Sequence, residues 1–182
     1  MPRFTAFLRA INVGGGRTAK MDTLRRLFES LGFSEVETFI ASGNVVFKTR
    51  TRNSKALESK IEQKLRQSLG YDVAVFVRTG AELARIVRYE PFPDSKRDDA
   101  LIARNVIFLA DALDRELAKK VKALKTVADE FRIRGRETYW LRRRMPGTPF
   151  STVPLERVIG RRFTIRSSNT VKKIADKFYS TD

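Results

Sequence analysis

The spacing of apolar residues in the first half of the chain predicts strands and helices in a fixed order. Residues 4–9 alternate between the two faces of a strand, and residues 21–31 repeat apolar side chains at helical spacing before Gly32. Two further strand-like runs, 36–40 and 44–48, are separated by small residues that favour a hairpin. The chain therefore opens with a strand, a helix and a β-hairpin.

A second helix and a fourth strand complete this half. The helix is expected to begin at a cap near Asn53 and to end at Gly70, and alternate valines at 73–77 indicate the strand. The resulting order, βαββαβ, is that of the ferredoxin-like fold. Thr79 and Glu82 have the spacing of a capping box and predict one more helix.

The second half of the chain follows a stretch with the composition of a linker. Residues 91–104 begin with two prolines and a run of charged residues. We therefore expect a ferredoxin-like α+β domain over 1–90 and a second, Arg-rich α+β domain over 105–182. The second domain follows the order β, α, β, β, α without a clear last strand, an abbreviated form of the first. Its hairpin turns at Gly135 and Arg136.

Strand alternation gives the first predicted sheet two different faces. If Phe4 and the residues that share its face contact the helices, the opposite face presents Phe7, Phe39, Val46 and Phe76. Such a face is too apolar to remain in contact with water. We expect the second domain to cover it, and a bound partner or a second copy of the chain are the alternatives.

Two residue types that are absent from the chain limit the catalytic and metal-binding chemistry that it can perform. The 182 residues include no cysteine and no histidine, which excludes disulfides, thiolate catalysis, the Ser-His-Asp triad and the usual zinc ligands. We predict no metal and no cofactor. An acid or base catalyst would have to be a carboxylate, Lys or Tyr. Because no signal peptide and no run of about 18 apolar residues is present, we expect a cytoplasmic protein that does not contact a membrane.

The positive charge of the chain is unevenly distributed. The net charge is +16, from 37 Lys and Arg against 21 Asp and Glu, and residues 132–166 supply +8 of it with ten arginines and two glutamates. A strong cationic excess concentrates polyanions such as nucleic acid near a protein surface. The same net charge is also expected if it serves only to keep the protein soluble. Binding of a polyanion and solubility both stay open as interpretations.

The Arg-rich stretch contains the first group of candidate binding residues. In the predicted hairpin, Arg132, Arg134 and Tyr139 share the face opposite the apolar residues. Arginine beside an aromatic ring suits phosphate contact combined with base stacking. The alternative is an Arg-rich face that is only solvated. The remaining candidate nucleic-acid-binding residues are Arg142, Arg143, Arg144, Arg161 and Arg162.

The loop after the first strand is a second candidate site. In βαββαβ topology this loop lies beside the hairpin between the second and third strands, so polar groups of two segments meet at one edge. A strand-to-helix junction of this kind can bind an anion. In the structural alternative, the glycines allow a tight turn and the polar side chains bond the loop backbone. The candidate ligand-binding residues are Arg9, Asn12, Gly14, Gly15, Ser42, Gly43 and Asn44.

The motifs at 8–15, 42–47, 155–160 and 164–174 together resemble the bacterial domain of unknown function 1697 family. The resemblance spans nearly the whole chain and implies a two-part α/β protein of ferredoxin-like type. It brings no established activity, substrate or cofactor. It adds Arg166 and Asn169 to the candidate ligand-binding residues.

Two functional hypotheses follow. The leading one is a non-enzymatic module that binds phosphate-bearing partners, such as nucleic acid or another polyanion, through the Arg-rich second half. The alternative is a small-molecule enzyme or sensor with a pocket between the domains near Arg9, Asn12, Ser42 and Asn44, where Glu37 or a lysine transfers a proton. The sequence leaves open whether the protein is a monomer or a weak dimer.

Overall fold

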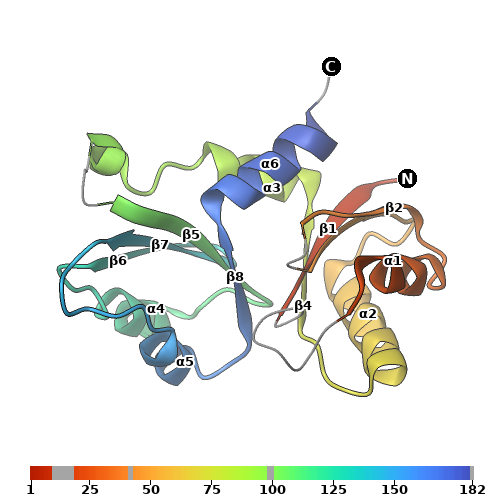
Figure 1. Cartoon of the computed structure of the whole chain (residues 1–182), viewed down its shortest axis with the longest axis horizontal. Helices are drawn as coiled ribbons and strands as arrows, with labels where there is room; N and C mark the ends of the chain where they lie inside the picture. The colour runs from red at the N-terminus through yellow and green to blue at the C-terminus, as the bar shows by residue number, and fades with distance from the viewer. Residues whose placement is uncertain (10–18, 41–42, 98–100, 181–182) are drawn as a thin grey trace. The chain divides into compact units, whose positions relative to one another are not determined.

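A computed structural model of the chain, shown in Figure 1, describes residues 1–9, 19–40, 43–97 and 101–180. The chain divides into two compact units. The first comprises Met1–Ile86 together with Ile174–Asp182, and the second comprises Val87–Lys173. The last residues of the chain therefore belong to the same unit as its first strand.

In the part of the chain that the structure describes, the first unit contains a four-stranded antiparallel sheet. The strands lie side by side in the order β2 (Ser34–Thr38), β3 (Asn44–Lys48), β1 (Arg3–Leu8) and β4 (Val75–Thr79). Helices α1 (Met21–Glu29) and α2 (Ser54–Leu69) lie on one face of this sheet (Figure 1). Helix α3 (Gly80–Arg88) follows β4. The predicted βαββαβ order of this half is confirmed.

The core of the first unit lies between the sheet and α1 and α2. Phe4 and Phe47 are opposite each other on β1 and β3, and both are buried against Phe28 of α1 and Leu57 of α2. Fully burying a side chain of this size stabilises the folded state by about 1.5–3 kcal/mol. The predicted division of the sheet into a helix-covered face and an opposite face is confirmed.

The N-termini of α2 and α3 are capped by the side chains that the sequence predicted. The side chain of Asn53 accepts a hydrogen bond from the backbone nitrogen of Ala56 at 3.1 Å and begins α2. At the start of α3, the backbone nitrogen of Thr79 donates to Glu82 Oε2 at 2.8 Å, and Thr79 Oγ1 accepts from the nitrogen of Glu82 at 3.2 Å. The predicted capping box is confirmed.

Strand β4 lies at an edge of its sheet. Glutamate carboxylates accept hydrogen bonds from the backbone amides of β4 that point away from the sheet. The backbone nitrogen of Val75 donates to Glu62 at 2.9 Å, and that of Val77 donates to Glu58 at 2.8 Å. Glu82 accepts from the next outward amide in the capping box. An unpaired edge strand is a template for pairing with another chain. Because these three backbone amides already donate to carboxylates, they are not available to pair with a strand of another chain.

The second unit contains a second four-stranded antiparallel sheet in its described residues. Its order is β6 (Asp129–Arg134), β7 (Glu137–Arg143), β5 (Leu101–Leu109) and β8 (Phe163–Ser167). Helices α4 (Arg115–Lys122) and α5 (Val153–Ile159) lie on one face (Figure 1), and α6 (Ser168–Tyr179) follows β8. The α+β fold with two such halves is confirmed.

Two features of this unit differ from the sequence prediction. Strand β8 was not predicted, because its five residues place Thr164 and Arg166 on one face and so lack a long apolar run. The stretch 91–104 contains the short 3-10 helix η1 (Pro93–Arg97) and the start of β5. Its prolines and acidic residues, which indicated a linker, all precede Ala100.

The core of the second unit is built on the predicted hairpin. Phe131 pairs with Trp140 and Arg132 pairs with Tyr139 across β6 and β7, as expected from the turn at Gly135. Phe131 and Trp140 are buried with apolar residues of α4 and α5, among them Val121. No helix among the described residues is both long enough and apolar enough to cross a membrane.

Candidate functional site

At the candidate site after the first strand, the end of β1 adjoins the β2–β3 hairpin, as the topology predicted. The backbone nitrogen of Leu8, at the end of β1, donates to the carbonyl of Gly43 at 2.8 Å, so this strand end adjoins the β2–β3 hairpin. The nitrogen of Arg9 donates to the carbonyl of Ala74 at 2.8 Å, which ties the same strand end to the chain just before β4. Outside the described residues lie Asn12, Gly14, Gly15 and Ser42.

Asn44 has a structural role in this hairpin. Its side chain is fully buried, and its Nδ2 donates to the carbonyl of Phe39 at 2.9 Å. The backbone nitrogen of Phe39 donates in turn to the carbonyl of Asn44 at 2.9 Å. Ile40 and Gly43, between them, both have positive φ angles. The side-chain amide of Asn44 thus links the hairpin to Phe39, next to two residues whose backbones are in the left-handed region.

Arg166 and Asn169 belong to the second unit. Arg166 is buried in β8 and donates to Thr164 Oγ1 and to the carbonyl of Ile165, both at 2.8 Å. Burial lowers the pKa of Arg166 to about 10, so the guanidinium remains charged at neutral pH. Asn169 is exposed in the first turn of α6. Beside it, Ser167 Oγ accepts from the backbone nitrogen of Thr170 at 3.1 Å.

The arginines of the Arg-rich candidate site lie in three different environments. Arg142 is buried, and its Nη1 contacts both carboxylate oxygens of Asp129 at 2.8 and 3.0 Å. Trp140 Nε1 donates to the same carboxylate at 2.8 Å, and Arg142 Nη2 donates to the carbonyl of Thr148 at 2.7 Å. Arg142 therefore holds a buried network together and does not present its charge to solvent.

The second environment is the face of the hairpin that carries Arg132, Arg134 and Tyr139. The guanidinium groups of Arg132 and Arg134 lie over the rings of Phe92 and Tyr89, 5.6 and 4.7 Å from the ring centroids. Both arginines are exposed, whereas Tyr139 is buried. Tyr89 packs on Tyr139 with ring centroids 4.8 Å apart. The aromatic that was predicted to stack on a base is therefore covered by the chain itself.

Carboxylates offset part of the charge on this face. Glu130 forms ion pairs with Arg132 and with Arg143, the second at 3.7 Å. Arg104 donates to the carbonyl and the hydroxyl of Ser95 at 3.0 and 2.9 Å, and it has no carboxylate partner among the residues that the structure describes. The arginines on the sheet face opposite α4 and α5 thus contact aromatic, acidic and polar residues of their own unit.

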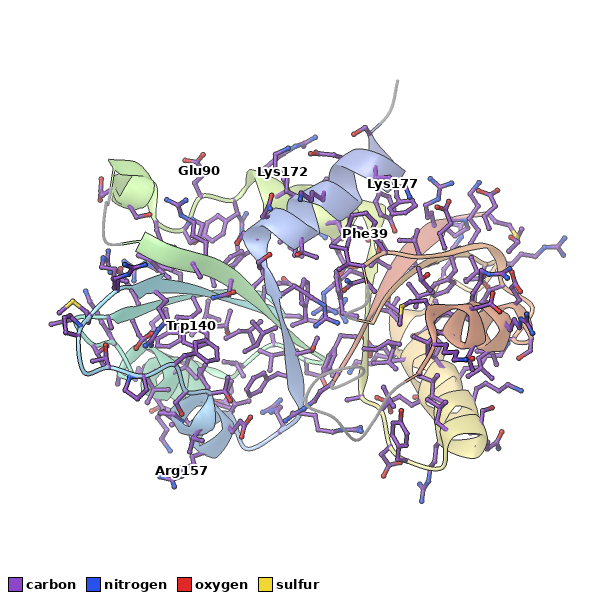
Figure 2. All side chains as sticks on the ribbon, viewed as in Figure 1. Phe39, Glu90, Trp140, Arg157, Lys172 and Lys177 are labelled. Atoms are coloured by element: carbon purple, nitrogen blue, oxygen red, sulfur yellow. The ribbon has the colours of Figure 1, made fainter. Side chains whose placement is uncertain are left out.

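The third environment is the chain between β7 and β8, where exposed arginines remain. In the described ranges, the side chains of Arg144, Arg157 and Arg161 are exposed and have no hydrogen-bond or carboxylate partner. Arg162 is exposed beside them. Figure 2 shows Arg157 on the outer side of α5. The connection between β7 and β8, here named the cationic surface of the second unit, thus carries exposed guanidinium groups at Arg144, Arg157 and Arg161.

Sequence reasoning missed several residues of this surface. Helix α4 packs beside α5 and adds the exposed Lys120 and Lys122, with Lys125 just beyond its end. The helical spacing of the apolar residues in α4 already placed these lysines on its outward side. Arg157 is the corresponding omission on α5. No group of three or more acidic side chains that could hold a metal ion occurs among the residues described.

Comparisons with known proteins agree with this architecture. The solved structure of the conserved bacterial protein SP0830 from Streptococcus pneumoniae is similar, with a TM-score of 0.72 and 22% identity over 96% of this chain and 97% of that chain. This similarity shows a shared fold. No curated protein matches the sequence. A family model described as a protein of unknown function, DUF1697, matches residues 1–139. The match includes all of the first sheet and most of the second unit's hairpin, and we conclude that the chain belongs to the DUF1697 family.

Proposed function

We propose that this protein is a non-enzymatic module that binds nucleic acid through exposed cations of its second unit. The observation that carries the proposal is that three side chains in the connection between β7 and β8, those of Arg144, Arg157 and Arg161, are exposed and have no carboxylate partner within the described ranges. Arginine binds phosphate through a planar fork of donors, and unpaired exposed guanidinium groups need no internal ion pair to break first.

The charge of the whole second unit supports the same function. Residues 87–173 contain 21 Lys and Arg and 11 Asp and Glu, which gives +10 of the total +16. A surface of this charge attracts phosphate backbones and accelerates their association at low salt. The absence of histidine and cysteine removes the commonest side chains for catalysis at neutral pH, which favours binding over reaction.

The test is fluorescence anisotropy with labelled RNA and DNA of mixed sequence at several salt concentrations. We expect affinity to fall by orders of magnitude between about 50 and 200 mM salt. The double variant Arg157→Gln/Arg161→Gln should weaken binding and reduce the salt slope by about 0.7 for each single-strand phosphate that the variant no longer neutralises.

The matched control removes two exposed arginines from the first unit. Arg50→Gln/Arg52→Gln changes the net charge by the same amount, and both of these residues are exposed. It should reduce affinity much less than the second-unit variant does. Equal reductions from the two double variants would show a non-specific charge effect, and absence of binding at low salt would refute the proposed function.

A further inference from the structure

Three aromatic rings form a continuous stack that runs from the core of the second unit to its surface. The rings of Phe131 and Trp140 stack with centroids 5.7 Å apart, and those of Trp140 and Phe150 stack at 5.1 Å with an interplanar angle of 20°. Phe131 and Trp140 are buried, whereas Phe150 is 62% exposed. One face of the Phe150 ring is packed on Trp140, and we name the opposite face of this largely exposed residue its outer face.

The chain around Phe150 is fixed by the buried network described above. Arg142 Nη2 donates to the carbonyl of Thr148 at 2.7 Å, and the Arg142 guanidinium lies 5.7 Å from the centroid of the Phe150 ring. The nitrogen and hydroxyl of Thr148 donate to the carbonyl of Met145 at 3.2 and 2.7 Å. A ring held in this way loses little conformational freedom when a ligand stacks on it.

Exposed arginines lie before and after Phe150 in the sequence. Arg144 precedes it in the same connection between β7 and α5, and Arg157 follows it on α5. Both are exposed and lack a carboxylate partner in the described residues. A planar aromatic face beside guanidinium groups is the combination with which proteins bind single-stranded nucleic acid, since the ring stacks on a base and the cations contact phosphates. A duplex does not offer the face of an unpaired base.

We propose that the ligand of this surface is a single-stranded nucleic acid, one base of which stacks on the outer face of Phe150. The base extends the stack of Phe131, Trp140 and Phe150 to four rings, and the neighbouring phosphates contact Arg144 and Arg157. The inference rests on the proposed function and adds to it the strandedness of the ligand and the residue that recognises a base.

The experiment compares three polyanions of equal length, namely oligothymidylate, the same backbone without bases, and a DNA duplex. Phe150→Leu keeps an apolar contact with Trp140 but removes the aromatic face, and it should weaken oligothymidylate binding by about 5- to 150-fold. It should leave binding of the abasic backbone unchanged. Phe150→Tyr keeps the ring and should bind oligothymidylate as the parent protein does.

Trp140 provides a direct readout of the site because it is the single tryptophan of the chain. Oligothymidylate should change its emission in the parent protein, whereas the abasic backbone should not. The matched control is Val127→Ala, which truncates another exposed apolar residue of the same unit and should change neither affinity nor emission. Thermal unfolding of each variant verifies that it is folded.

The outcomes separate this inference from the proposed function. If the abasic backbone and the duplex bind as tightly as oligothymidylate, or if Phe150→Leu retains full affinity, base stacking on Phe150 is refuted while salt-dependent polyanion binding stands. If none of the three polyanions binds at low salt, both proposals fail.

Discussion

The hydroxyl oxygens of Thr5 and Tyr179 lie 2.8 Å apart and join the first strand of the chain to its last helix. Further contacts surround this pair. Arg3 Nη1 donates to the carbonyl of Phe178 at 2.6 Å, and the rings of Phe39 and Phe178 meet edge to face at 6.0 Å. The final turns of α6 therefore cover part of the sheet face opposite α1 and α2. Figure 2 labels Phe39 on this face and Lys177 on α6.

Removing the phenolic hydroxyl should destabilise the fold. Tyr179→Phe leaves the fully buried Thr5 hydroxyl without this partner, and an unsatisfied buried group costs about 1–3 kcal/mol. Urea unfolding measures the change. The control is Lys177→Ala, which breaks an exposed ion pair with Glu37 and should cost less than about 1 kcal/mol. Equal stability of Tyr179→Phe and the parent protein would contradict the prediction.

The same phenol makes stability depend on pH in the alkaline range. Burial raises the pKa of Tyr179 from 10.0 to about 12, so the folded state retains a proton that the unfolded state releases. This contribution is fully present below pH 10 and is lost as the pH rises from about 10 to 12. The difference in unfolding free energy between the parent protein and Tyr179→Phe should shrink over that interval. A constant difference would show that the phenol does not titrate differently in the two states.

Gly80 marks how closely α6 packs on the start of α3. A Cβ atom at this position would lie 2.3 Å from Cδ1 and 2.7 Å from Cε1 of Tyr179. Gly80→Ala should therefore cost about 1–3 kcal/mol by overpacking. In a double-mutant cycle, Tyr179→Ala should remove most of this cost because it removes the clashing ring. Additive effects of the two substitutions would locate the strain elsewhere.

Thr138 and Thr5 form a matched pair of buried threonines with opposite expected behaviour. Both are fully buried on strands, but Thr138 Oγ1 has no hydrogen-bond partner among the described residues, whereas Thr5 Oγ1 bonds Tyr179. Thr138→Val should stabilise the protein by about 1 kcal/mol, because it replaces an unsatisfied hydroxyl by a methyl group of similar volume. Thr5→Val should destabilise it. Thermal unfolding of both variants tests the sign of each change.

Arg142 should act on stability and not directly on ligand binding. Arg142→Ala leaves Asp129 without its buried cation, and breaking a buried pair costs about 3–5 kcal/mol. Arg144→Ala, two residues away on the surface, should change stability by less than about 0.5 kcal/mol but weaken nucleic-acid binding. Chemical unfolding and anisotropy on the two variants separate these roles. A stable Arg142→Ala variant would contradict the structural role.

Local patterns explain which parts of the fold were predictable. The Asn53 cap, the capping box at Thr79 and Glu82, and the pairing of Phe131 with Trp140 involve residues close in sequence whose chemistry specifies one local structure. Strand β8 was not evident because it is short and half polar, and it is stabilised by pairing with the distant β5.

The candidate sites were harder to predict because their exposure depends on distant segments. The meeting of the β1 end with the hairpin follows from topology, and the sequence predicted it. The cover that Tyr89 places over Tyr139 comes from a segment about fifty residues earlier, with no pattern that connects the two. The Arg142–Asp129 pair depends likewise on strand register. Sequence therefore identified the Arg-rich region but could not separate its buried members from its exposed ones.

The membership of Ile174–Asp182 in the first unit has a consequence for synthesis of the protein. At translation rates of about 5–20 residues per second, Thr5 emerges from the ribosome roughly nine to thirty-five seconds before Tyr179. During that interval the nascent first unit lacks the helical turns that cover part of its sheet. Its native packing is completed only after the entire second unit has been translated, so chaperones that recognise apolar surface have a defined period in which to bind.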